Sequence, residues 1–399
     1  MNLNQDLTFA PSSRHRTVAL VLIAVGVVVA AYGIVADPKR AWPSLLLNGF
    51  YFASLALSGL FFISTQRLTG ARWSASLRRI PEAFMAALPY GAILLLVLYF
   101  GRHWVFPWSD PSIFAHEPLV NGKVIAGHVA YLQVPFVFSR LVVCVLLWVV
   151  FGWLFRRWSL EQDRSPGKNM AIHNRLNRLT PVFVIVFALS FTVVSYDLII
   201  SLEPKWSSTM SGVYTFAGLF VSGIAAVTLA TLFLREHSPL RDWISDRQIH
   251  DLGKLLFAFS TFWAYIWTCQ YLLIWYGNIP DEVTHFVKRT HSPWLYFFGL
   301  NVVVNWVVPF LALISVKAKC TPKVLKAICV LVLCGHWLDL YMLIMPAQWD
   351  SPKILLELPI AAGYAGLLYF IFTRSLAQAP LVAMNDPILL AEMQVEHAH

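Results

Sequence analysis

Charged side chains are scarce in this sequence: Asp, Glu, Lys and Arg make up 13% of its 399 residues, whereas hydrophobic residues make up 58%. Soluble domains carry roughly 25% charged residues. So few charges cannot cover a water-exposed surface of ordinary size, which excludes a soluble globular domain. Most side chains must therefore face lipid or one another. We predict an all-α polytopic protein of the bacterial inner (cytoplasmic) membrane.

Sequence motifs that would hold a redox metal or a nucleotide are missing as well. The five cysteines form no CxxC or CxxCH pair, which argues against disulfides, iron–sulfur clusters and covalent haem. Of the twelve histidines only His336 lies deep in an apolar stretch, whereas a membrane cytochrome b needs facing pairs. No Walker A loop and no HExxH sequence occurs. We therefore expect no metal and no cofactor to be bound by this chain alone.

Long apolar stretches, in contrast, run through the whole sequence. About 20 apolar residues suffice to cross the roughly 30 Å hydrocarbon core of a membrane. The runs do not alternate as membrane-crossing strands do, so we predict helices. Eleven of the 16 tryptophans fall near the expected span ends, as in an interfacial belt. We expect residues 1–399 to form a single membrane domain with about ten spans, near residues 17–36, 43–66, 82–101, 129–155, 179–201, 211–234, 251–276, 293–317, 323–346 and 354–374.

The basic residues indicate how these spans are oriented. A net charge of +9 could suggest a nucleic-acid partner, but Lys and Arg lie in short connections between apolar stretches. One set of alternate connections, with both termini, carries 21 of them, the other set carries eight, and Arg140 lies inside a span. This bias predicts that both termini are cytoplasmic and that the number of spans is even. The polar N-terminus lacks a cleavage site, so we expect the first stretch to be retained as a helix. We expect lipid, and no nucleic acid, around the chain.

Ionisable side chains inside the spans are few, and each costs roughly 2.5–3.5 kcal/mol near the bilayer centre. His336 and Asp339 share one helix face and can pass a proton between them. Arg140, the deep permanent cation, needs a carboxylate such as Asp197 or Asp339. Such a pair could simply hold helices together, or it could belong to a proton path or a quinone contact. The candidates for proton transfer or quinone contact are Arg140, Asp197, Glu203, Glu282, His336 and Asp339.

Two further polar groups allow two interpretations each. His250, Asp251 and Lys254 share a face at the start of the seventh expected span. They could form an ordinary helix cap and ion pair, or take up protons from the cytoplasm. Asn301 and Asn305, four residues apart in the eighth span, could join helices or line a polar track.

Four stretches of the sequence resemble one known family closely. They are His250–Glu282 (HDLGKLLFAFSTFWAYIWTCQYLLIWYGNIPDE), Ser195–Gly218, Val129–Arg140 and His336–Ala347. All four resemble the F subunit of alternative complex III, a bacterial quinol:electron-acceptor oxidoreductase of electron transport. That subunit belongs to the NrfD-like family, which includes the membrane subunit of polysulfide reductase. The resemblance implies two four-helix bundles with flanking helices.

The resemblance also implies partners and a function. The partners would be a homologous C subunit, an iron–sulfur B subunit and c-type cytochrome (haem c) subunits. Quinol oxidation is assigned mainly to the C subunit. This chain would contribute proton translocation, with or without a quinone (menaquinone) pocket of its own, and would not be catalytic alone. The matching stretches contain all six candidates for proton transfer or quinone contact, and also His250, Asp251 and Lys254.

Two other functions remain open at this point. The chain could be a structural scaffold whose buried charges only pack helices. It could also be a proton-coupled secondary transporter. Transporters of that kind tend to carry interrupted helices in matched halves, and the sequence displays no matched pair of interrupted spans.

Overall fold

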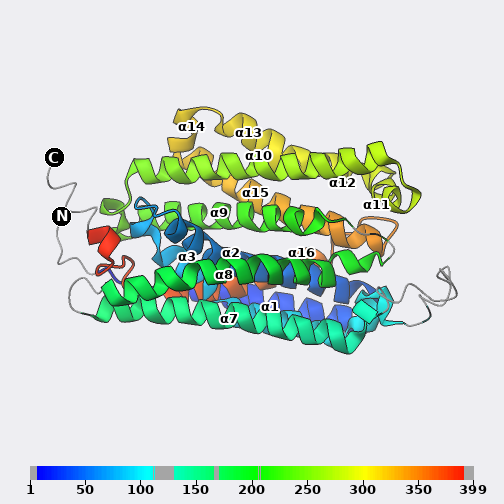
Figure 1. The fold of residues 1–399 in the computed structure, drawn as a ribbon, viewed down its shortest axis with the longest axis horizontal. Helices are drawn as coiled ribbons and strands as arrows, with labels where there is room; N and C mark the ends of the chain where they lie inside the picture. The colour runs from blue at the N-terminus through cyan, green and yellow to red at the C-terminus, as the bar shows by residue number, and fades with distance from the viewer. Residues whose placement is uncertain are drawn as a thin grey trace.

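The structure, a computed structural model, describes residues 7–110, 112, 130–165, 170–204, 206 and 208–390. All regular secondary structure in these residues is helical, which confirms the all-α prediction. Figure 1 shows the long helices lying side by side along the longest axis of the molecule. The long or paired helices are α1 (Ser13–Ala36), α2 (Pro38–Leu68), α3 (Arg79–Met85), α4 (Leu88–Leu96), α7 (Val134–Arg164), α8 (Met170–Leu198), α9 (Ser211–His237), α10 (Asp246–Gly277), α12 (Leu295–Val302), α13 (Val308–Leu313), α15 (Pro322–Ile344) and α16 (Glu357–Leu376). Shorter helices are α5 (Arg102–Val105), α11 (Pro280–Thr290) and α14 (Val316–Cys320).

Eight helical stretches of the described chain are long and apolar enough to cross a membrane, so this is a multi-pass membrane protein. They are Ser13–Ala36, Pro38–Leu68, Arg79–Tyr99, Val134–Arg164, Met170–Leu202, Ser211–His237, Leu295–Leu313 and Pro322–Ala347. Helices α10 and α16, which we also expected to span, are present with 32 and 20 residues. They are less apolar than the other eight, because α10 is rich in Trp and Tyr and α16 contains Pro359, Arg374 and two tyrosines. The ninth and tenth crossings, and the division into two four-helix bundles, stay predictions.

Helices α2 and α9 form the centre of the fold. Both are buried along most of their length, and they contact each other. Helix α2 also packs against α1, α4, α8, α15 and α16, and α9 packs against α8, α10 and α15. By contrast, few residues of α1 and of the α12–α13 stretch are buried, as expected of helices that face lipid. The central pair thus provides the scaffold to which the polar residues of the outer helices point.

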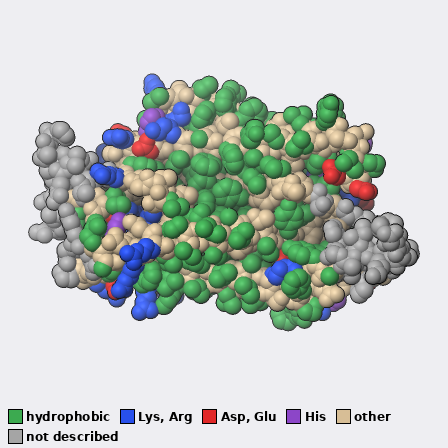
Figure 2. All heavy atoms as spheres, viewed as in Figure 1, with side chains coloured by type: hydrophobic (Ala, Val, Ile, Leu, Met, Phe, Trp, Pro, Cys, Tyr) green, Lys and Arg blue, Asp and Glu red, His purple; other side chains and the backbone are tan. Residues whose placement is uncertain are grey.

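The described ends of the chain meet at one end of the bundle. The backbone N–H of Leu381 donates to the carbonyl of Leu7 at 2.9 Å. An even number of crossings brings the ends together in this way. Most Lys and Arg visible in Figure 2 gather at the left, the end where α1 begins and α16 finishes. The assignment of that end to the cytoplasm stays a prediction.

Two of the spans are locally irregular. Helix α3 gives way to α4 at Ala86–Ala87, and α12 passes into α13 through a π-helical turn at Val303–Val307. Pro89 and Pro309 lie just beyond these points. A proline has no N–H for the carbonyl four residues earlier, which loosens the helix there. Ala86 and Ala87 keep right-handed helical angles, so the backbone bends without unwinding.

Helices α1 and α16 pack closely because glycines meet between them. A Cβ added to Gly363 would lie 2.6 Å from the Cα of Gly26. Small residues at such a crossing let two backbones approach, which is how helices associate tightly in membranes.

The substitution Gly363→Ala should therefore push α1 and α16 apart and lower stability by about 1–3 kcal/mol. The matched control is Gly299→Ala in α12, where nothing lies within 4 Å of an added Cβ. Thermal unfolding of the two variants in detergent measures the difference. A loss of equal size in both would contradict close packing at Gly363.

Candidate functional site

Asp339 of α15 lies at the centre of a polar cluster within the apolar core. Its Oδ1 atom accepts hydrogen bonds from the Tyr214 hydroxyl of α9 and from Asn301 Nδ2 of α12, the latter at 2.7 Å. Its Oδ2 atom accepts from Trp263 Nε1 of α10 at 3.1 Å. The carboxyl group is buried, and all three donors are electrically neutral. Helices α9, α10 and α12 thus converge on this carboxyl group of α15, and none of the three donors from the described residues is an Arg or Lys.

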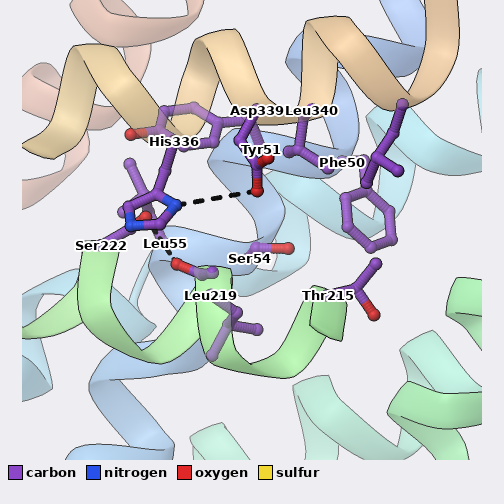
Figure 3. A pocket seen from close by; sticks show the side chains of 12 residues that line it. Phe50, Tyr51, Ser54, Leu55, Thr215, Leu219, Ser222, His336, Asp339 and Leu340 are labelled. Atoms are coloured by element: carbon purple, nitrogen blue, oxygen red, sulfur yellow. Dashed lines mark hydrogen bonds and ion pairs between the residues drawn. The ribbon is translucent and has the colours of Figure 1, made fainter. Parts of the chain in front are cut away.

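His336, one turn before Asp339 on α15, faces the same space. Its Nδ1 lies 3.9 Å from Asp339 Oδ2, beyond direct hydrogen-bonding distance. Both ring nitrogens are buried and have no hydrogen-bond partner among the described residues. The prediction that His336 and Asp339 share a face is confirmed by this geometry, which Figure 3 shows. A gap of this size between two proton-carrying groups suits a bridging water.

Small cavities lie on two sides of Asp339. One, of about 20 Å³, is lined by polar groups from three helices, among them His336, Thr215, Ser54 and Ser222 (Figure 3). The other, of about 30 Å³, is lined by Asp339 together with Tyr214, Asn301, Gln270, His285 and Arg289. A space of about 10–15 Å³ or more can hold one water molecule if polar partners surround it. Asp339 therefore lies between two water-sized spaces whose largely apolar walls each include several polar side chains.

The second cavity leads to a cluster of charged groups around Glu203. His285 Nδ1 lies 2.6 Å from Glu203 Oε2, and Arg289 Nη1 lies 3.2 Å from Oε1. Burial by itself would raise the pKa of Glu203, but Arg289 and His285 outweigh burial, so the pKa lies well below its ordinary value. Burial and Arg289 lower the pKa of His285 to about 4 despite the opposing effect of Glu203. Near pH 7 the ring is neutral and donates its Nδ1–H to Glu203.

Sequence reasoning identified Glu203 but missed His285 and Arg289, because it treated residues 277–292 as a connection. The structure forms α11 there, with a proline in its first turn and acidic residues following. His285 and Arg289 are four residues apart and lie on the buried face of α11. Pro280 is a residue type that favours the first turn of a helix, and apolar and basic residues recur on one face of the segment after it. Together these two features could have predicted the helix and its buried face.

Arg140 has Asp197 as its carboxylate. Its Nε and Nη2 atoms donate to the two oxygens at 3.0 and 2.8 Å, and its guanidinium lies 3.9 Å from the Tyr131 ring centroid. Of the two partners considered from the sequence, Asp197 is the one in contact. Both oxygens of the Asp197 carboxylate accept a hydrogen bond from Arg140, so this ion pair joins α7 to α8.

No model of a known protein family matches this sequence, and no curated protein matches it. The resemblance to the F subunit of alternative complex III therefore stays a hypothesis. In the described part of the chain, no three or more His, Cys, Asp or Glu side chains gather as a metal-binding group.

The other sequence candidates do not join the Asp339 cluster. Glu282 is half-buried at the start of α11, and its backbone carbonyl accepts from Trp206 Nε1 at 3.1 Å. Asp251 and Lys254 form an ion pair at 2.5 Å on the flank of α10, and His250 precedes them. At 1.5 Å per residue, Asp251 lies about 18 Å along α10 from Trp263. The expected ion pair of Asp251 and Lys254 is therefore present, whereas the expected cap is wrong, because Ser245 and Gln248 cap α10.

Asn301 and Asn305 belong to the cluster as well. Asn305 Nδ2 donates to Asn301 Oδ1 at 2.7 Å and to the Gly335 carbonyl at 3.0 Å. The pair therefore joins the π-helical turn after α12 to α15, and it also orients the amide that donates to Asp339. Both interpretations offered by the sequence apply, because the same bonds join helices and extend the polar cluster.

A second buried charged network was not anticipated at all. Arg79 pairs with Glu82 at 2.5 Å and with Asp163, and Ser159 donates to Glu82 at 2.5 Å. The spacing of Arg79 and Glu82 is a recognisable helix pair. Asp163 comes from α7, so no local pattern could have placed it there.

Removing one partner of the Arg140–Asp197 pair should be costly. We expect Arg140→Met alone to lower stability by about 3–5 kcal/mol, because Asp197 is left as a buried unpaired charge. Arg140→Met combined with Asp197→Leu should recover most of the loss. Thermal unfolding in detergent compares the variants. A double variant as unstable as the single one would contradict this role.

The low pKa values of His285 and Glu203 predict an acid-sensitive end of the molecule. The unfolded chain binds the His285 proton below pH 6.5, whereas the folded chain binds it only near pH 4. Stability should fall as the pH drops through this window, by roughly 3 kcal/mol in all at about 1.4 kcal/mol per pH unit. Glu203 adds to the loss below its unfolded pKa, near 4.5. Unfolding midpoints measured from pH 7 to 4 should decline less steeply in His285→Gln, and an unchanged slope would count against a neutral buried ring.

Proposed function

We propose that this chain is the cofactor-free membrane subunit of a respiratory or photosynthetic quinol:electron-acceptor oxidoreductase, similar to the F subunit of alternative complex III. Its contribution would be proton transfer through Asp339. The partners would be the homologous C subunit, the iron–sulfur B subunit and the c-type cytochromes. Quinol oxidation in a partner releases protons, and electrons leave through the partners' haem c and iron–sulfur groups.

The observation that supports proton transfer is the setting of Asp339. A permanently ionised carboxylate in an apolar core is normally matched by a cation, as Asp197 is by Arg140. Asp339 has neutral donors, and the His336 ring lies 3.9 Å from its Oδ2 atom. A carboxyl group held in this way can exist in both protonation states at a tolerable energy, which a proton carrier requires.

The route follows from the polar groups around the two cavities. A proton would pass between the Glu203 cluster and Asp339 through water in the cavity that Arg289 and Gln270 line. It would pass between Asp339 and His336 through water in the other cavity. Imidazole suits the second step, because its ordinary pKa lies near neutrality. The direction of transfer depends on which partner supplies the proton.

A scaffold function is the main alternative, and specific contacts favour it. The Arg140–Asp197 pair joins α7 to α8, and Glu357 of α16 accepts two bonds from Arg40 at 3.0 and 3.1 Å. A proton-coupled transporter has less support. Its substrate site usually lies at unwound helix segments, and the interruptions at Ala86–Ala87 and Val303–Val307 remain helical.

The substitution Asp339→Asn tests the proposal. It preserves the size of the side chain and its hydrogen-bond acceptor but carries no proton, so quinol-driven acceptor reduction and proton release should fall by about 10². The assembled complex in proteoliposomes is the system to measure. Asp339→Glu should retain part of the activity.

Glu357→Gln is the matched control, since that buried carboxylate pairs with Arg40 and lines neither cavity. Wild-type turnover and proton release in Asp339→Asn would favour the scaffold. Purification of the chain without haem-bearing and iron–sulfur partners would overturn the respiratory assignment itself.

A further inference from the structure

A large apolar cavity lies apart from the Asp339 cluster. It measures about 700 Å³ and lies between α9, α15 and α16, over a floor of buried α2 and α3 side chains. The hollow exists because small residues line α9 and α16. These are Ala226, Ala230, Ala361, Ala362 and Ala365. On α16 the lining runs from Leu358 to Phe372, a length of about 21 Å at 1.5 Å per residue.

Two of the polar groups in the wall of this groove are already engaged in hydrogen bonds within the protein. The Tyr51 hydroxyl donates to the Leu333 carbonyl at 2.7 Å, and Trp337 Nε1 donates to Asn48 at 2.9 Å. Neither is free to bind a quinone carbonyl. The remaining surface is almost wholly hydrocarbon, which suits an acyl chain. The hydrocarbon core of a membrane is roughly 30 Å thick, so one leaflet contributes about half of that depth. The groove, at about 21 Å, is longer than the hydrocarbon depth of one leaflet.

Positive charge gathers at one end of the groove only. Lys326 of α15 lines the groove at that end and forms an ion pair with Glu236. Exposed or half-exposed basic residues at the same end of the bundle are Arg14, Arg16 and Lys323. His15 lies with its ring centroid 6.1 Å from Tyr369 of the groove wall, and its buried Nδ1 atom has no hydrogen-bond partner among the described residues.

We propose that this groove binds an anionic phospholipid of the leaflet at the basic end. The acyl chains lie along the alanine-lined wall, and the phosphate lies between Lys326 and His15. Charge complementarity selects an anionic headgroup, because Arg14, Arg16 and Lys323 carry positive charge beyond that of Lys326, which Glu236 pairs. The lipid fills the space between α16 and α9–α15 and so holds the α1–α16 pair against the core.

The bound chain also closes the molecule beside the proposed proton site. Tyr51 and Leu55 line both this groove and the cavity next to His336 and Asp339. A hydrocarbon chain on their outer side keeps bulk water from the lateral face of that cavity. This consequence rests on the proposed function, whereas the binding of lipid does not.

Lipid retention by the purified full-length chain, with any partners that co-purify, tests the proposal. After delipidation in detergent, the protein is exposed to vesicles of phosphatidylglycerol or phosphatidylcholine, and bound phosphorus and thermal unfolding are measured. We expect phosphatidylglycerol to be retained and to raise the unfolding temperature more than phosphatidylcholine. Lys326→Gln should weaken retention of phosphatidylglycerol about fivefold. Glu236→Gln, which leaves Lys326 uncompensated, should retain at least as much as the wild type.

Filling the groove provides the second arm. Ala230→Leu with Ala362→Leu should reduce retention of both lipids, whereas Ala24→Leu on the exposed side of α1 should not. Equal retention of the two lipids by the wild type, or undiminished retention by the filled variant, would overturn the proposal. Recovery of quinone rather than phospholipid from the wild type, lost in the filled variant, would overturn it too. These outcomes leave the Asp339→Asn measurement unaffected, so the two proposals fail separately.

Discussion

The cost of a carboxylate in a low-dielectric interior determines how this bundle is held together. Buried carboxylates are matched by arginines on other helices: Asp197 of α8 by Arg140 of α7, and Glu357 of α16 by Arg40 of α2. Each pair ties together segments that packing alone would hold less specifically. The buried carboxyl group of Asp339 is stabilised differently, by hydrogen bonds from neutral donors of α9, α10 and α12. The same physical constraint thus yields ion pairs at the helix contacts and one carboxyl group held by neutral hydrogen-bond donors.

The surroundings of Asp339 depend on an element that does not cross the membrane. Arg289 of α11 donates to the carbonyls of Met342 and Leu343 at the end of α15, at 2.8 and 2.9 Å, while it also contacts Glu203. Trp206 stacks on His285 with a centroid distance of 3.8 Å, which covers the cluster. Helix α11 therefore closes one end of the bundle and places a charged group within reach of the second cavity. A short amphipathic helix sets the boundary between bulk solvent and the polar interior.

Composition and patterning predicted much of the architecture. The scarcity of charge and the long apolar runs predicted a helical membrane protein, and helices occur at all ten expected ranges, eight of them apolar enough to span. Two of the prolines in these ranges, Pro89 and Pro309, follow local irregularities. Pro135 falls in the first turn of α7, where proline fits without bending the helix. Such effects depend only on the residue type and on its position within the helix, so they can be predicted from a single sequence.

What the sequence by itself determined is the cost of the membrane-embedded residues: His336, Asp339, Arg140 and Asp197 stood out because an apolar setting penalises them. Only the tertiary structure decided how each penalty is met. It paired Arg140 with Asp197 rather than Asp339, brought Tyr214 and Trp263 to Asp339, and added His285 and Arg289. The reason is physical. Insertion cost depends on a residue and its depth, whereas pairing depends on how helices distant in sequence turn toward one another.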